Sequence, residues 1–324
     1  MKILLAGATG VVGRRLIPLL VQAGHEVAGT TRRSERADVL RDLGAKPVVV
    51  DMLDAAAVRE VVAAERPDAV IHQLTDLSDE DFSANSHLRI EGTRNLVDAA
   101  KAAGVETMIA QSIAWLYVPG AAPAVETDPL DASLPPYEGV AALEAAVAEM
   151  PRGVVLRYGA LYGPGTWYAP DGAIAERVRA GTMRPAPSWT SFVHADDAAS
   201  AALAALEWPA GAVNVVDDEP ATTADWLPVY SAAIGAPDPG NAGKHAAPMG
   251  RPVSNAKALG LGWKPQVASW RTGFSQKGAG PNGSAPKPDA PSSDGPRPDS
   301  AKADGKGDGA KGDGSRMNGT ARTS

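Results

Sequence analysis

The chain has 324 residues and a formal net charge of −7, from 31 Lys and Arg against 38 Asp and Glu. A mildly acidic chain lacks the concentrated basic face that a nucleic-acid-binding protein needs. Cysteine is absent, which excludes disulfides, thiolate nucleophiles and cysteine-ligated metal. Its apolar runs are too short for a membrane span or a secretory signal, so we expect a cytoplasmic enzyme or binding protein.

The composition changes abruptly after residue 274. Residues 275–324 consist mainly of Gly, Pro, Ser, Ala, Asp and Lys, and Met317 is their only large apolar residue. Such a segment buries too little apolar surface to offset the entropic cost of ordering. We therefore predict a disordered tail over residues 275–324, and a folded part over residues 1–274.

Short apolar runs alternate with helical patterns through the first half of the chain. Strands are expected at residues 2–6, 26–30, 47–50, 69–72 and 107–110, and helices at residues 14–23, 37–43, 55–64 and 87–103. This alternation predicts a parallel sheet covered by helices on both faces and connected by right-handed crossovers. The predicted fold class is α/β, a doubly wound parallel sheet of the Rossmann type.

A glycine-rich turn follows the first expected strand and opens the first expected helix. In dinucleotide-binding folds the first glycine permits the tight turn, the second lets the backbone approach the pyrophosphate, and the third permits close helix packing. Free N–H groups at the helix start then bind the phosphates. The predicted cofactor-binding residues of this turn are Gly7, Thr9, Gly10, Val11, Val12 and Gly13.

The end of the second expected strand bears on the choice of cofactor. NAD-binding proteins place an acidic residue there for the ribose hydroxyls, whereas this chain has Arg32 and Arg33, with no carboxylate between them and Glu35. A guanidinium group binds phosphate through two hydrogen bonds. The pair favours NADP(H) over NAD(H); the alternative is that both arginines only form a solvated approach to the next helix.

Several further segments resemble one family in the right order. They are Asp51-Met52 and residues 70–74, 91–100, 156–165, 192–197, 213–215 and 261–265. Together with the glycine turn they make residues 1–274 similar to the extended short-chain dehydrogenase/reductase family, also called the NAD(P)-dependent epimerase/dehydratase family. The resemblance implies a dinucleotide-binding Rossmann core over residues 1–165. It also implies a smaller, mixed substrate subdomain with returning core elements over residues 166–274.

The resemblance also implies contacts and catalytic groups. Asp51 and Met52 are expected beside the adenine, and Gln73 and Leu74 beside the cofactor. The family pairs a tyrosine with a lysine four residues later and with a Ser or Thr hydroxyl. Tyr137 fills the tyrosine position at the start of a helical stretch over residues 138–149.

Other members of that catalytic set are missing. Ala141 stands at the lysine position, and no lysine occurs between residues 102 and 243. Ile113 stands at the hydroxyl position, with Ser112 one residue earlier. Arg89 replaces the family's helix asparagine.

These departures favour reduction over oxidation. A nearby cation normally makes the tyrosine a better base, so its loss harms oxidation of an alcohol more than protonation by a neutral phenol. We predict an atypical extended short-chain oxidoreductase that uses NADP(H) to reduce a carbonyl of a small or sugar-like substrate, with Tyr137 and Ser112 as catalytic candidates. Two alternatives stay open: an NAD-dependent nucleotide-sugar epimerase/dehydratase, and a catalytically depleted NADP(H)-binding sensor or scaffold.

Aromatic residues gather where the family lines its substrate cleft, which indicates a flat or apolar substrate, although ordinary packing explains them equally well. The candidate cleft residues are Trp115, Tyr117, Trp167, Tyr168, Arg184 and Trp189. His72 and His194 are expected to have structural roles, and no metal site is expected. A small-molecule substrate is the expected partner, without nucleic acid or membrane; a homodimer through the helices near 87–103 and 138–149 is one option.

Overall fold

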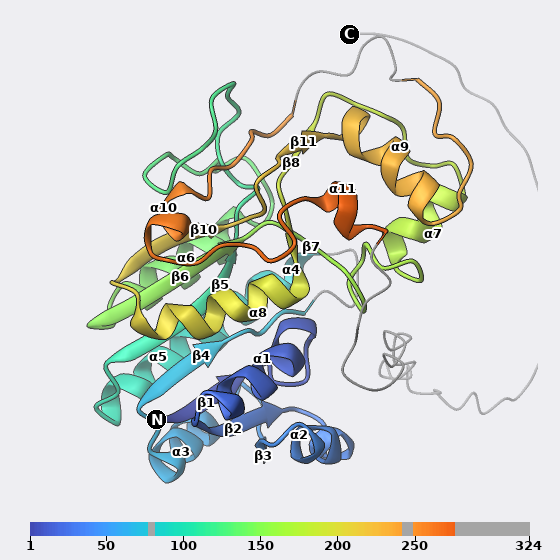
Figure 1. Cartoon of the computed structure of the whole chain (residues 1–324). Coiled ribbons are helices and arrows are strands. Elements are labelled where there is room, and N and C mark those ends of the chain that lie inside the picture. The colour runs from blue at the N-terminus through green and yellow to red at the C-terminus, as the bar shows by residue number, and fades with distance from the viewer. Residues whose placement is uncertain (77–81, 242–248, 276–324) are drawn as a thin grey trace, which may run out of the picture. The chain divides into compact units, whose positions relative to one another are not determined.

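The computed structural model describes residues 1–76, 82–241 and 249–275 (Figure 1). Apolar runs form a seven-stranded sheet in the order β10–β6–β5–β4–β1–β2–β3, and every neighbouring pair is parallel. The strands are β1 (Lys2–Ala6), β2 (Glu26–Thr31), β3 (Lys46–Val49), β4 (Ala69–His72), β5 (Thr107–Ile113), β6 (Arg152–Tyr158) and β10 (Gly211–Val215). This order reverses direction between β1 and β4, as in the doubly wound Rossmann fold, so the predicted fold class is confirmed.

Helices cover both faces of this sheet. They are α1 (Val11–Gln22), α2 (Ala37–Asp42), α3 (Ala55–Glu65), α4 (Phe82–His87), α5 (Thr93–Ala102), α6 (Tyr137–Val147) and α8 (Ala195–Ala204), with short turns η1 (Ser34–Arg36), η2 (Leu88–Gly92) and η3 (Ala205–Glu207). In the described part of the chain, no helix combines the length and the apolar composition needed to cross a bilayer. The predicted tail lies outside the described residues except for Ser275.

The alternation of side chains along β1 divides the core into two layers. Ile3 and Leu5 face α1 and α8, while Leu4 and Ala6 face α3, α5 and α6. All four side chains are fully or almost fully buried. Parallel strands buried on both faces need continuous apolar runs, which is why this strand contains no polar residue after Lys2.

The helix expected over residues 87–103 is divided into three parts. It runs as α4, then as a π-helical turn, η2, and then as α5. The hydrophobic spacing could not reveal this π-helical turn. Over only five residues, the difference between a π-helix and an α-helix changes the apolar pattern little. The π-helical turn contains Arg89, which is buried.

The remaining elements lie beyond β6. They are β7 (Ala160–Tyr162), β8 (Trp189–Thr190), β9 (Phe192–His194), β11 (Ala221–Thr222), α7 (Ala173–Arg179), α9 (Thr223–Ala233), α10 (Ala256–Gly260) and α11 (Trp270–Gly273). An aromatic cluster fixes several of them, with Phe192 in edge-on contact with Trp226 and Tyr168. The proposed subdomain boundary at residue 165 stays a prediction.

Candidate functional site

The carboxyl ends of the seven strands meet at one edge of the sheet. This edge collects residues singled out from the sequence: Gly7 follows β1, Arg32 follows β2, Asp51 lies two residues after β3, and Gln73 follows β4. In open parallel sheets, ligands bind outside these ends where the strand order reverses. Here that point lies between β1 and β4, which are hydrogen-bonded neighbours.

The glycine turn at this point leaves no room for side chains. Gly7 adopts a φ of +82°, and a Cβ atom there would lie 2.5 Å from the Gln73 carbonyl oxygen. A Cβ atom at Gly13 would fall on the Gly7 carbonyl oxygen. The turn is closed by the Gly10 N–H, which donates to the Gly7 carbonyl over 3.0 Å. Gly7 and Gly13 therefore require glycine for a steric reason.

The first turn of α1 offers N–H groups to an anion. Gly10 is the N-cap and supplies no side chain to satisfy the helix start. The N–H groups of Val11, Val12 and Gly13 have no partner within a helix that begins there, and the helix dipole makes this end positive. These residues fit the pyrophosphate of a dinucleotide.

Polar groups flank that turn. The Gln73 side chain is buried, and neither its Oε1 nor its Nε2 has a hydrogen-bond partner among the described residues. Arg32 is exposed and lies 3.3 Å from Asp76 through Nη2 and Oδ2. Arg33 is also exposed, and its N–H donates to Thr31 Oγ1. Both arginines are thus accessible at the end of β2.

The expected adenine contacts lie in a turn between β3 and α3. Asp51 is exposed, and its Oδ1 accepts the Leu53 N–H over 3.0 Å. Met52 is buried, and its carbonyl accepts from the Asn95 side chain over 2.9 Å. The structure therefore leaves the Asp51 carboxylate at the surface and fixes Met52 in the core. Leu74, after β4, donates its N–H to His72 Nδ1 over 3.1 Å.

Arg15 connects the glycine turn to the second half of the chain. Its Nη1 donates to the Val11 carbonyl, Nη2 to the Pro164 carbonyl over 2.6 Å, and Nε to Asp196 Oδ1 over 2.7 Å. The guanidinium group therefore contacts its own helix, the segment after β7 and the start of α8. Sequence patterns gave no signal of this role.

Tyr137 is the first residue of α6 and is half-buried. Ala141 and Glu144 follow at spacings of four and seven residues, which places all three on one face of the helix. The Tyr137 hydroxyl has no hydrogen-bond partner among the described residues. This helix face therefore presents one phenol and no lysine.

Ser112 is fully buried, and its hydroxyl donates to Glu144 Oε1 over 2.7 Å. Arg157 donates to the same carboxylate from Nε (3.0 Å) and Nη2 (2.7 Å). Although burial acts to lower the pKa of Arg157, the hydrogen bonds with Glu144 raise it overall. The hydroxyl predicted to bind substrate is thus engaged in a buried ion pair that sequence reasoning missed. A charged residue inside the apolar strand 152–158 was the available signal.

A second buried arginine lies near this pair. Arg89 on η2 is 3% exposed, and its buried Nε has no hydrogen-bond partner among the described residues. Burial lowers the pKa of Arg89 to about 10, and the attraction of Glu144 opposes that effect.

The neighbouring histidine is neutral. His72 Nδ1 accepts the Leu74 N–H, so Nε2 holds the proton and donates to Thr93 Oγ1 over 2.9 Å. Burial lowers the pKa of His72 to about 3, and the charge of Arg89 lowers it further. The His72 ring therefore orders the end of β4 and does not exchange protons near neutrality.

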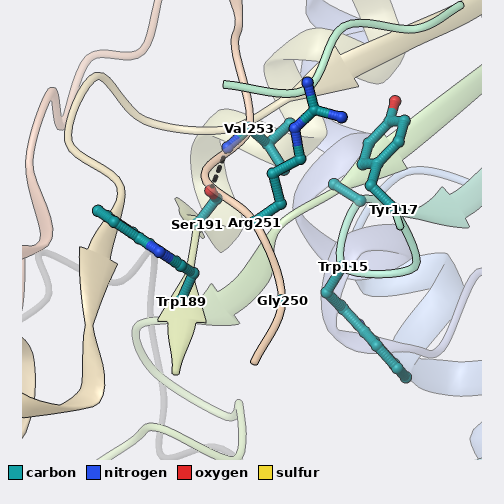
Figure 2. Close-up of a pocket in the computed structure, with 8 residues that line it drawn as sticks. Trp115, Tyr117, Trp189, Ser191, Gly250, Arg251 and Val253 are labelled. Carbon is teal, nitrogen blue, oxygen red and sulfur yellow. Dashed lines mark hydrogen bonds between the residues drawn. The ribbon is translucent and has the colours of Figure 1, made fainter. Parts of the chain in front are cut away.

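A small, shallow pocket lies beyond the end of β5 (Figure 2). Its lining residues are Ala114, Trp115, Tyr117, Trp189, Ser191, Gly250, Arg251 and Val253. Three of these, Trp115, Tyr117 and Trp189, are among the predicted cleft residues. Figure 2 shows the two indole rings on opposite sides of the segment that contains Gly250. The lining thus combines aromatic rings with the polar side chains of Ser191 and Arg251.

Hydrogen bonds and an ion pair join three segments around this pocket that are far apart in the sequence. The Val253 N–H donates to Ser191 Oγ over 3.1 Å, and the Trp189 N–H donates to the Met249 carbonyl over 2.8 Å. Arg251 donates from Nε to the Ala122 carbonyl, and its Nη2 lies 2.9 Å from Asp128 Oδ2. The pocket wall is therefore fixed from several sides.

The other predicted cleft residues do not line this pocket. Trp167 is 39% exposed, and Tyr168 belongs to the aromatic cluster, where its ring also contacts Trp226 and Tyr230. Arg184 is exposed and donates to the Met183 carbonyl. For Tyr168, the position in the subdomain core explains the aromatic side chain.

Comparison with known proteins agrees with the motifs. The profile of the NAD dependent epimerase/dehydratase family matches residues 3–216. A 3-diazoavenalumate denitrifying reductase from Streptomyces sp. is 43% identical over 310 residues, covering 86% of this chain and 100% of that protein. The match to this reductase therefore extends beyond the region that the family profile covers.

Solved structures share the fold. The UDP-glucose 4-epimerase of Thermus thermophilus, solved with NAD, has a TM-score of 0.70 and 27% identity over 85% of this chain and 97% of that one. The Bordetella bronchiseptica enzyme WbmG, solved with NAD and UDP, has a TM-score of 0.71 and 22% identity over 85% and 93%. The chain therefore belongs to the NAD dependent epimerase/dehydratase family, as its motifs predict, and is an NAD(P)-dependent enzyme of that family.

Proposed function

We propose that the chain is an NADP(H)-dependent reductase that transfers hydride to a small planar aromatic substrate. The observation that supports this most directly is the apolar character of the two positions where the family has acid/base groups. Ile113 and Ala141 stand there, and the nearby Ser112 hydroxyl is bonded to Glu144. Oxidation of an alcohol needs a base to take the hydroxyl proton, so this site favours the reductive direction.

Without a group that donates a proton, the substrate itself must take up the electron pair that arrives with the hydride, for example by losing a neutral leaving group. A diazo-aromatic compound does so: as hydride forms the new C–H bond, the C–N bond breaks and its electron pair leaves with neutral dinitrogen. Carbon is reduced, NADPH is oxidised to NADP⁺, and no proton is required. The 43% identical relative, named as a reductase of a diazo compound, supports this substrate class for this chain.

The cofactor half of the proposal is supported by the glycine turn and the end of β2. When bound, NADPH supplies the hydride. The N–H groups at the start of α1 would hold its pyrophosphate, and Arg32 would hold the 2′-phosphate. Asp76 now lies 3.3 Å from Arg32, so a bound phosphate would compete with that carboxylate.

The substrate half is supported by the pocket. Trp115 and Trp189 offer flat apolar surfaces for a conjugated ring. Tyr117 turns its hydroxyl toward Asn214, at 2.6 Å, so its ring rather than its hydroxyl lines the wall. The aromatic residues of this lining favour a planar aromatic molecule over a sugar, which needs several polar partners.

Carbonyl reduction is a second candidate, and the position of Tyr137 favours it. The phenol opens α6 and has no partner among the described residues, so it is available to protonate an oxygen. In that reaction Tyr137 would be the general acid. The two candidates differ in their need for this one proton.

The test measures NADPH oxidation by absorbance with 3-diazoavenalumate and with a planar aryl aldehyde, for the wild type and Tyr137→Phe. The proposal expects diazo reduction in both proteins, because no proton is needed. Aldehyde reduction that falls about 10²–10⁴-fold in the variant would establish the second candidate instead. Turnover of neither substrate, with NADPH bound, would favour a sensor, and interconversion of UDP-sugars would favour an epimerase.

A further inference from the structure

Arg89 is a buried cation whose Nε has no hydrogen-bond partner among the described residues. Its side chain comes from the π-helical turn η2, and the whole residue is 3% exposed. Its Nε–H is a buried donor without a partner, and leaving a charged donor unsatisfied is costly. Such a group needs an acceptor from a water molecule, an ion or a ligand.

The nearest counter-charge is already engaged. Glu144 Oε1 accepts from Ser112 and Arg157, and Oε2 accepts from Arg157 again. Arg89 is attracted by Glu144 but forms no ion pair with it. The cluster therefore holds two arginines and one carboxylate, and the excess positive charge belongs to Arg89.

Arg89 lies near the carboxyl edge of the sheet. Its turn η2 packs against α6, the helix of Tyr137 and Ala141, and Thr93, directly after η2, is hydrogen-bonded to His72 at the end of β4 over 2.9 Å. The helices on either side are close, because a Cβ atom at Gly139 of α6 would lie 2.8 Å from Ser86 Cα of α4. Arg89 thus lies between the cofactor edge of the sheet and the helix with the acid/base positions.

We propose that the Arg89 guanidinium faces the nicotinamide end of the bound cofactor and makes the site prefer NADPH to NADP⁺. This inference rests on the proposed function. The ribose hydroxyls and the carboxamide oxygen of the cofactor can accept its hydrogen bonds. Its charge repels the cationic ring of NADP⁺ but not the neutral ring of NADPH. The residue would therefore bias binding toward the cofactor form that a reductase consumes.

Three variants separate this role from a structural one. Arg89→Met removes the charge and keeps most of the volume, and Arg89→Lys keeps the charge. Arg157→Met is the matched control, because Arg157 is buried to a similar degree, at 7% exposed, but is fully partnered. The measurements are Tm without ligand and Kd for NADPH and NADP⁺ by titration.

Arg89→Met is expected to raise the Tm of the ligand-free protein by about 2–4 °C, because an unpaired buried charge is removed. Arg157→Met is expected to lower it. The ratio of the NADP⁺ Kd to the NADPH Kd should fall about tenfold in Arg89→Met and stay near the wild-type value in Arg89→Lys.

Two results would overturn this inference alone: a lower Tm for Arg89→Met, as for Arg157→Met, or an unchanged Kd ratio with NADPH still bound. Failure of the wild type to bind NADPH would overturn the proposed function, and this inference with it. These outcomes are distinguishable because the wild-type titration decides the second case before any variant is made.

Discussion

Glu144 of α6 and Arg157 of β6 are joined by two hydrogen bonds inside the protein, 3.0 Å from Nε to Oε1 and 2.7 Å from Nη2 to Oε2. Their side chains are 16% and 8% exposed. The pair joins α6, which begins with Tyr137, to β6. Arg157 Nη1 also donates to the hydroxyl of Tyr117, a residue that lines the pocket.

Glu144→Gln should therefore lower the free energy of unfolding by about 3–5 kcal/mol, because Arg157 then stays buried without its counter-charge. Urea denaturation monitored by tryptophan fluorescence measures this change. Glu149→Gln is the control, because Glu149 bonds Arg94 at the surface and should affect stability little. Equal effects of the two substitutions would contradict the importance assigned to burial.

Gly13→Ala should abolish NADP(H) binding and destabilise the fold, because its Cβ would fall on the Gly7 carbonyl oxygen and lie 2.8 Å from Ala8 Cα. Cofactor titration and thermal unfolding report the two effects. Gly260→Ala is the matched change, since a Cβ atom there has open space and the backbone has no positive φ. A Gly13→Ala protein that binds NADPH normally would contradict the geometry of the turn.

Arg32→Gln should weaken NADPH binding about 10- to 100-fold and leave NADH binding nearly unchanged, because only NADPH has the 2′-phosphate. Titration with both reduced cofactors by fluorescence measures the ratio. Arg184→Gln, another exposed arginine, should change neither affinity. An equal loss of affinity for NADPH and NADH would show that Arg32 does not bind the 2′-phosphate.

Asp217 should make stability depend on pH in an unusual direction. It is 2% exposed, and burial raises the pKa of its carboxyl to about 8, against about 3.9 in an unfolded chain. The folded state therefore binds the proton more tightly, and its contribution to stability is complete below about pH 4 and is lost as the pH rises through 8.

Urea unfolding between pH 5 and pH 9 measures this dependence. Asp217→Asn should flatten the decline, because the amide does not ionise, although it accepts only one of the N–H groups of Trp270 and Glu219 that the carboxylate holds. Asp42→Asn, at an exposed position of α2, should keep the wild-type slope. An unchanged slope in Asp217→Asn would assign the decline to other groups.

Local patterns predicted the Rossmann half well. The run Lys2–Ala6, the glycine spacing and the strand at Ala69–His72 each depend on neighbours in sequence, and the structure confirms them. The position of α6 is also close to prediction, beginning at Tyr137 rather than at residue 138. Buried parallel strands and glycine turns reveal themselves because their requirements are local.

The ion cluster could not be found in this way. Contact between Ser112 and Glu144 depends on how α6 is rotated against β5, and the two residues are 32 positions apart. The partnership of Arg251 with Ala122 spans 129 positions. The ring of Tyr168, a predicted cleft residue, packs against Phe192, and its place in the cleft stays a prediction. Such contacts are fixed by tertiary packing alone.

Arg15 gives this arrangement a mechanical consequence. One side chain contacts the first turn of α1, the Pro164 carbonyl and Asp196 at the start of α8. A displacement of the glycine turn should therefore shift the segments that contain Pro164 and Asp196 as well. Coupling between two binding events is reciprocal. If cofactor binding helps to order these segments, a substrate that orders them first raises the affinity for the cofactor by the same free energy. The Arg15 guanidinium group thus adds a polar link between the two ends of the site to the apolar packing of α1 against α8.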